Sequence, residues 1–149
     1  MNSPHSVLIV AAESELRLAL KTWLVKRGFD VQEASNLDEA IAAIFDVPDT
    51  SAIICDQRLP DGGALNLLFW LREQLFAAPF LMITGYSRQK LTSAPKFEVI
   101  KVPVTGKKLE DLLQRVLPFD IGPYRQTSTK RKSRFMKSRR SAARNSKLK

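Results

Sequence analysis

Cysteine and histidine are nearly absent from this sequence. Among its 149 residues there is one cysteine, Cys55, and one histidine, His5. A single cysteine cannot form an internal disulfide, and Cys55 lies in an apolar run, where we expect it to pack as a small hydrophobic side chain. His5 belongs to a polar N-terminal stretch, so we expect it to be exposed to solvent rather than to bind a metal or receive a phosphoryl group.

Long apolar runs are also missing. The longest apolar region, Leu65–Ile83, is interrupted by Arg72 and Glu73, whereas a membrane-spanning helix needs about 20 consecutive apolar residues. The N-terminal sequence MNSPHSVLIV lacks the basic residues that begin a signal peptide. These absences predict a cytoplasmic protein with no membrane span. The hydrophobic content of 44% is sufficient for a buried core.

Acidic residues are missing from the C-terminal segment. Residues 124–149 contain 11 Lys or Arg and no Asp or Glu, which leaves 13 basic and 15 acidic residues for the first 123. The net charge of +9 therefore arises in this segment alone. Apolar periodicity stops at Asp120. We predict a globular domain over residues 1–120 and a basic, disordered tail over residues 121–149.

The first 120 residues alternate between strand-like and helix-like patterns. Short apolar runs predict strands at 7–12, 29–32, 52–56, 80–84 and 97–102. Helical spacing predicts helices at 15–27, from Asn36 to just before Pro48, and at 64–74, 88–93 and 106–117. Five strand–helix repeats predict an α/β fold in which a five-stranded parallel sheet is doubly wound, with helices on both faces and right-handed crossovers.

Functional sites on such sheets lie beyond the carboxyl ends of the strands. This rule selects four segments of the sequence: Ala11-Ala12-Glu13, Asp56 with the loop after it, Thr84-Gly85 and Val102-Pro103. Asp56 is the most conspicuous, because it follows four apolar residues at the end of a central strand.

These strand ends resemble those of the response-regulator receiver domains of two-component systems. The similarity extends over residues 6–118 and is closest in the sequence DQRLPDG at 56–62, a form common in receivers attached to hybrid histidine kinases. The matching segments are Val7–Glu13, Ile54–Leu65, Ile83–Gly85 and Val102–Val104. The resemblance implies a flavodoxin-like fold with strand order 2-1-3-4-5, and a signalling module rather than an enzyme.

The resemblance also implies a phosphorylation site. In the family a histidine kinase passes a phosphoryl group to the aspartate that Asp56 matches, and the hydroxyl that Thr84 matches then bonds the phosphoryl oxygens. A magnesium ion is held by that aspartate, an acidic pair after the first strand and a backbone carbonyl. A lysine on the fifth strand adds a further positive charge.

Two of these parts are missing here. The acidic pair is replaced by Ala11 and Ala12, and Glu13 matches a third acidic position from which it could reach a metal only through water. Val102 occupies the lysine position, and Lys101 lies one residue earlier, so its side chain should point away from Asp56 unless the strand is bulged or the alignment shifts.

Three hypotheses follow. In the first, the chain is an atypical receiver with weak or no Mg²⁺ binding, which regulates a histidine kinase or another signalling protein by contact. In the second, it is a working phospho-acceptor that uses Asp56 and Thr84 with Glu13-bound metal or with Lys101. In the third, it is a basic protein associated with nucleic acid, in which the receiver fold serves as a homodimer or docking unit.

The basic tail bears on the third hypothesis. Its densest cations are Lys130, Arg131, Lys132, Arg134, Lys137, Arg139 and Arg140. Such a segment could contact nucleic-acid phosphates without sequence specificity, an anionic membrane surface or an acidic partner, or it could only increase solubility. The sequence contains no helix-turn-helix pattern, so we do not expect sequence-specific DNA binding.

Overall fold

A five-stranded parallel sheet forms the centre of the molecule. The computed structural model describes residues 5–85, 95–119 and 121. Its sheet contains β1 (Ser6–Val10), β2 (Asp30–Ala34), β3 (Ala52–Asp56), β6 (Phe80–Thr84) and β7 (Glu98–Lys101), in the order β2-β1-β3-β6-β7. The intervening β4 (Arg58–Leu59) and β5 (Gly62–Gly63) form a separate small hairpin. The five main strands thus have the predicted order 2-1-3-4-5, which is confirmed.

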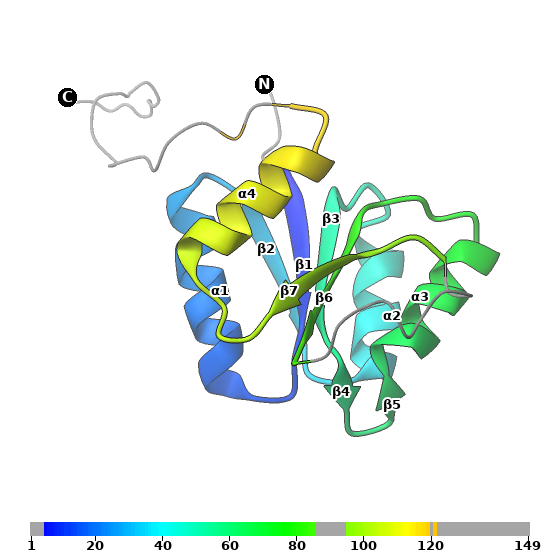
Figure 1. Ribbon diagram of the computed structural model, residues 1–149. Coiled ribbons are helices and arrows are strands. Elements are labelled where there is room, and N and C mark those ends of the chain that lie inside the picture. Colours follow the sequence, from blue (N-terminus) through cyan, green and yellow to red (C-terminus); the bar gives the residue numbers. More distant parts are fainter. Residues whose placement is uncertain (1–4, 86–94, 120, 122–149) are drawn as a thin grey trace. The chain divides into compact units, whose positions relative to one another are not determined.

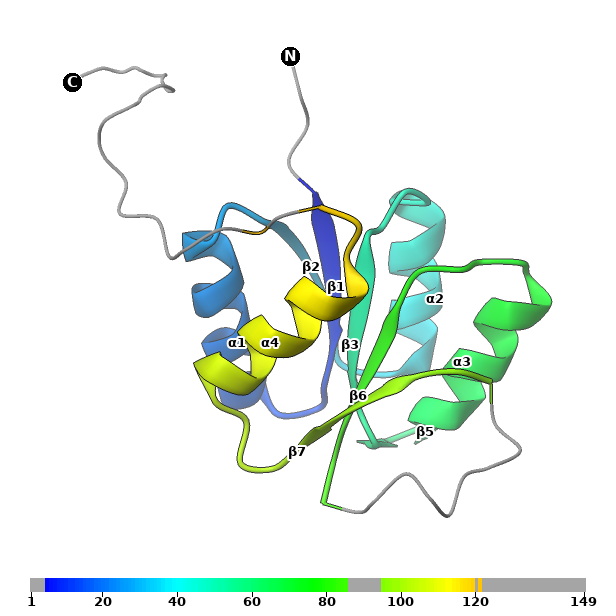
Figure 2. The same ribbon diagram turned by 45° about the horizontal axis from the view of Figure 1, so that its top comes forward.

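Helices cover both faces of this sheet, as predicted (Figures 1 and 2). Helices α1 (Ser14–Lys26) and α4 (Gly106–Val116) lie on one face, and α2 (Leu37–Asp46) and α3 (Ala64–Glu73) lie on the other. The helix predicted at 88–93 lies outside the described residues. None of the described helices is both long and apolar enough to span a membrane.

The alternation of strand side chains divides the core into two parts. Val7 and Ile9 of β1 pack with α1 and α4, whereas Leu8 and Val10 pack with α2 and α3. All five residues of β1 are buried, because successive side chains of a strand point to opposite faces and both faces are covered. The continuous apolar run at the start of the sequence is explained by this double burial.

Two predicted helix boundaries are confirmed. Asn36 accepts a hydrogen bond from the backbone N–H of Glu39 at 2.8 Å and so caps the start of α2. The Glu39 carboxylate binds the backbone N–H of Ser35 at 2.7 Å instead of that of Asn36. Gly28 follows α1 with φ +91°, the left-handed conformation that commonly ends a helix.

Helix α3 also ends in a left-handed residue, but here the residue is Leu75 instead of a glycine. Leu75 adopts φ +61°, and the N–H groups of Leu75 and Phe76 bond the carbonyls of Arg72 and Leu71 in a Schellman motif. Leu75 is 90% exposed, so its side chain gains little from burial there, while a non-glycine residue in this conformation costs about 1–2 kcal/mol.

Replacing Leu75 with glycine should therefore raise the free energy of unfolding by about 0.5–1 kcal/mol, after allowing for the added entropy of glycine in the unfolded chain. Urea denaturation of the wild type and the variant measures this change. Leu75→Ala is the matched control, because it shortens the side chain but keeps the Cβ atom and should give no comparable gain. Loss of stability in Leu75→Gly would contradict this account.

Candidate functional site

A cavity of about 390 Å³ lies at the carboxyl ends of β3 and β6. Its lining residues are Asp56, Gln57, Arg58, Ile83, Thr84, Gly85 and Val102. Asp56 ends β3 and is half-buried, opposite Ile83 of β6. The structure thus brings Asp56 and Thr84 into one cavity at the sheet edge where the sequence places the site.

The hydroxyl of Thr84 is bonded within this cavity. It donates a hydrogen bond to Oε1 of Gln57, and the backbone N–H of Gln57 bonds the Ile83 carbonyl at 2.9 Å. Thr84 is buried. Gln57, the residue after Asp56, is therefore bonded to the end of β6 through both its backbone and its side chain. This contact was not predicted from the sequence.

Lys101 does not line the cavity, whereas Val102 does. Lys101 is exposed and pairs in register with Thr84. The structure thus does not place Lys101 among the residues that line the cavity with Asp56.

At the end of β1, the guanidinium group of Arg17 is hydrogen-bonded to backbone carbonyl oxygens. Nη1 of Arg17, in α1, donates to the carbonyl oxygens of Ala11 and Ala12 at 2.7 and 3.0 Å. Nε of the same side chain lies 3.5 Å from a carboxylate oxygen of Glu33 in β2. Glu13 is exposed and does not line the cavity. Arg17 was not among the site residues predicted from the sequence, although side chains on a helix lean toward its N-terminus and can reach this strand end.

The residues at this strand end do not suit a cation. Ala11 is buried and Ala12 is exposed, and their methyl groups offer no oxygen ligand. Their carbonyl oxygens already accept hydrogen bonds from a guanidinium. Magnesium binds through one or two carboxylates with near-octahedral oxygen ligation. Within the part of the chain that the structure describes, no three His, Cys, Asp or Glu side chains form a potential metal-binding group.

The loop after Asp56 is attached to α2. The sequence predicts only a loop here, but the structure has the small β4–β5 hairpin, whose two-residue strands are too short to give a sequence pattern. The Asp61 carboxylate accepts hydrogen bonds from the backbone N–H groups of Leu37 at 2.8 Å and Asp38 at 3.3 Å. The bond from Leu37 is the main cause that lowers the pKa of Asp61 below its ordinary value of 3.8, because it stabilises the charged carboxylate.

This contact predicts a pH dependence of stability. A carboxylate whose pKa is lowered by folding stabilises the native state above its unfolded pKa, and that stability is lost as the pH falls through the lowered folded pKa. We expect Asp61→Asn to reduce the loss of unfolding free energy below about pH 4, as measured by urea denaturation across pH 2–6. An identical pH dependence in wild type and variant would contradict the role given to Asp61.

Cys55 precedes Asp56 but is buried in the core under α2 and α3. Burial strongly raises the pKa of its thiol, and the neighbouring Asp56 charge raises it further. A thiol that remains protonated is a poor nucleophile. The structure thus favours the interpretation of Cys55 as a core residue.

Comparison with known proteins identifies the family. A protein-family model described as "Response regulator receiver domain" matches residues 7–114. The chain belongs to this family. The receiver shares its fold with solved structures, among them the chemotaxis protein CheY4 of Vibrio cholerae, which has a TM-score of 0.71 at 24% identity and covers 77% of this chain and 100% of that one.

Curated relatives include longer regulatory proteins. The response regulator protein PilR of Pseudomonas aeruginosa is 29% identical over 119 residues, which is 77% of this receiver chain. The transcriptional regulatory protein GltR of the same organism is 32% identical over 85 residues, or 56% of this chain. The matched regions cover only 26% and 35% of these two relatives.

The cationic residues of the predicted tail are not placed by the structure. Lys130, Arg131, Lys132, Arg134, Lys137, Arg139 and Arg140 all lie outside the described residues.

Proposed function

We propose that this chain is an atypical receiver that regulates a signalling protein by direct contact, and that Asp56 is not phosphorylated by the Mg²⁺-assisted route of the family. Receiver domains in general interact with histidine kinases and other signalling proteins. What distinguishes this receiver, in our proposal, is that phosphorylation of Asp56 does not control the contact.

The observation that carries the proposal is the pair of hydrogen bonds from Arg17 to the carbonyls of Ala11 and Ala12. In the family resemblance these two positions hold acidic side chains that bind a metal. Here Ala11 and Ala12 carry no charge, and their backbone carbonyl oxygens accept hydrogen bonds from the guanidinium group of Arg17. A divalent cation at this strand end would lack ligands and would be repelled by Arg17.

A missing Mg²⁺ ion matters because the Asp56 carboxylate and the incoming phosphate are both anions and must come into contact during phosphorylation. At a separation of ~4 Å, two unit negative charges repel by about 4 kcal/mol at an effective dielectric near 20. If nothing offsets this repulsion, it lowers the rate by about a thousandfold. The second positive charge that the family supplies, from the strand lysine, is also not placed at Asp56, because Val102 rather than Lys101 lines the cavity.

The Thr84 contact supports the same proposal. Its hydroxyl donates to Gln57, so rearrangement toward a phosphoryl group would require this hydrogen bond to break. The side chains of Gln57 and Thr84 hold the ends of β3 and β6 together without a phosphoryl group. We propose that this connection keeps the receiver in one signalling state.

A second candidate function retains Asp56 as a phospho-acceptor. The observation that favours it is that Asp56, Thr84 and the cation Arg58 line the same cavity. In this alternative Arg58 rather than Lys101 would supply positive charge to the incoming phosphoryl group.

Incubation with acetyl phosphate and Mg²⁺ separates the two candidates. Intact-mass spectrometry measures the fraction of chains that gain one phosphoryl group, with Asp56→Asn as the control. We expect no species heavier by one phosphoryl group in either the wild type or the control. A phosphorylated fraction that is present in wild type and absent in Asp56→Asn would overturn it, and its loss in Arg58→Gln would assign the charge to Arg58.

A further inference from the structure

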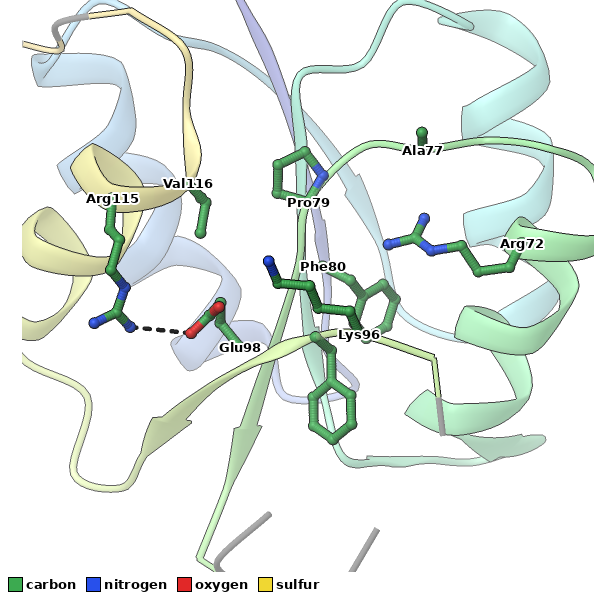
Figure 3. Close-up of a pocket in the computed structure, with 9 residues that line it drawn as sticks. Arg72, Ala77, Pro79, Phe80, Lys96, Glu98, Arg115 and Val116 are labelled. Atoms are coloured by element: carbon green, nitrogen blue, oxygen red, sulfur yellow. Dashed lines mark hydrogen bonds and ion pairs between the residues drawn. The ribbon is translucent and has the colours of Figure 1, made fainter. Parts of the chain in front are cut away.

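A second cavity lies at the opposite ends of the strands from Asp56. It also has a volume of about 390 Å³ and lies where β6 and β7 begin, between α3 and α4. Arg72, Lys96 and Arg115 line it together with a single acidic residue, Glu98. In Figure 3 the Arg72 side chain extends toward the cavity from one side, the Arg115–Glu98 pair lies on the other, and the Lys96 side chain rises between them. The cavity therefore has an excess of two positive charges.

The guanidinium of Arg72 is held in place by the chain itself. It donates hydrogen bonds to the carbonyl oxygens of Phe76 and Ala78, at 2.5 and 3.1 Å. Arginine has five N–H donors, so these two bonds leave others available. Burial lowers the pKa of Arg72 somewhat, yet arginine stays protonated at neutral pH. A partly desolvated, fixed cation interacts with an anion more strongly than a freely hydrated one.

The other cations differ in how far they are neutralised. Nη2 of Arg115 lies 3.0 Å from Oε1 of Glu98, so these two charges compensate each other. Lys96 has no ion pair or hydrogen bond among the described residues. The uncompensated charge is thus shared by Lys96 and Arg72, on two sides of one cavity.

The segments outside the described residues offer little to neutralise this charge. The segments outside the described residues, which are 1–4, 86–94, 120 and 122–149, contain one acidic side chain, that of Asp120. The remaining walls are apolar and include Pro79, Phe80 and Phe97. A small hydrated anion would leave these walls without a contact, whereas an anion with an apolar body would cover them.

We propose that this cavity is a binding site for an organic carboxylate with an apolar body, whose charged group lies between Lys96 and Arg72. The carboxylate belongs either to a free small acid or to an acidic side chain of a partner protein that is flanked by an aromatic residue. The site lies at the amino ends of the strands and does not depend on the chemistry of Asp56.

Nuclear magnetic resonance titration of the full chain tests the site, with benzoate as the probe. We expect saturable shifts of the backbone amides of Lys96, Phe97 and Glu98, and none with the uncharged analogue benzamide. Lys96→Gln should weaken benzoate binding by about tenfold or more, as expected for loss of one charge-assisted hydrogen bond. Lys107→Gln, which removes the same charge from an exposed residue of α4, should leave the affinity unchanged.

A variant of opposite sign separates binding from damage to the fold. Glu98→Gln removes the one carboxylate that lines the cavity and breaks its ion pair with Arg115. The affinity for benzoate should therefore be at least about threefold higher in this variant than in the wild type. A merely destabilised fold would not bind the probe more tightly. Equal binding of inorganic phosphate and benzoate, or equal benzoate affinity in wild type, Lys96→Gln and Glu98→Gln, would overturn the proposal.

A blocked Glu-Phe dipeptide distinguishes the two sources of the carboxylate. Tighter binding of the dipeptide than of benzoate, with the same dependence on Lys96, supports an acidic segment of a partner protein. Binding of benzoate alone supports a free small acid. Binding of neither probe would overturn the proposal.

Discussion

Replacing Ala12 with aspartate is expected to raise the affinity of this receiver for Mg²⁺ by about tenfold, because it adds a carboxylate to a strand end that has none. Ala12 is exposed, so the new charge stays hydrated and the fold should tolerate it. Titration with Mg²⁺ followed by isothermal calorimetry measures the change. Ala12→Asn is the matched control, since it has nearly the same shape without the charge and should bind Mg²⁺ no better than wild type.

Replacing Ala11 as well with aspartate should raise the Mg²⁺ affinity further but lower the stability of the metal-free protein. Ala11 is fully buried, so an ionised side chain there destabilises the metal-free fold by about 3 kcal/mol. In the Ala11→Asp/Ala12→Asp variant we expect about a hundredfold gain in Mg²⁺ affinity over wild type, and an unfolding free energy that rises with Mg²⁺ concentration. Equal Mg²⁺ affinity in wild type and both variants would contradict the explanation given for Ala11 and Ala12.

Replacing Gly62 with alanine is expected to lower the free energy of unfolding by about 2–3 kcal/mol. Gly62 has φ +149°, a conformation that L-residues rarely adopt, and an added methyl group would lie 2.6 Å from Cδ1 of Leu37. Both effects act on the loop after Asp56, next to the Asp61 carboxylate that caps α2. Urea denaturation measures the loss.

The adjacent glycine provides the control for this prediction. Gly63 has φ −119°, which any residue adopts, and an added methyl group would lie 3.4 Å from the Gln57 carbonyl oxygen, close to ordinary contact. Gly63→Ala should cost about 1 kcal/mol or less, the difference between glycine and alanine at a helix N-cap. Similar losses in the two variants would show that the conformation of Gly62 is not the cause.

The fold was predictable from the sequence because its signals are local and agree with one another. Strand β1 is buried on both faces and has a continuous apolar sequence, while the edge strand β2 is exposed or half-buried along most of its length and contains more polar residues. Asn36 and Gly28 mark helix ends through hydrogen bonds and backbone angles that depend on near neighbours only. The order of the strands then followed from the family resemblance.

The site was predictable only in part. The apolar run before Asp56 predicts its place at a strand end, and the cavity there is lined by Val102 and not by Lys101. The contact of Gln57 with Thr84 joins residues that are 27 positions apart in the sequence. Arg17 is only six positions from Ala11, but the rotamer that makes this contact is set by packing. The cavity lined by Arg72, Lys96 and Arg115 likewise combines α3 with β7 and α4, which follow it by more than 20 residues in the sequence.

Fluorine nuclear magnetic resonance of beryllofluoride tests whether Asp56 accepts a phosphoryl group with the help of Mg²⁺. This compound mimics a phosphoryl group on an aspartate, and it is added with Mg²⁺ to the wild-type receiver and to Asp56→Asn. We expect the same spectrum for both, with no saturable bound signal at Asp56. A saturable bound signal that is present in the wild type and absent in Asp56→Asn would contradict it.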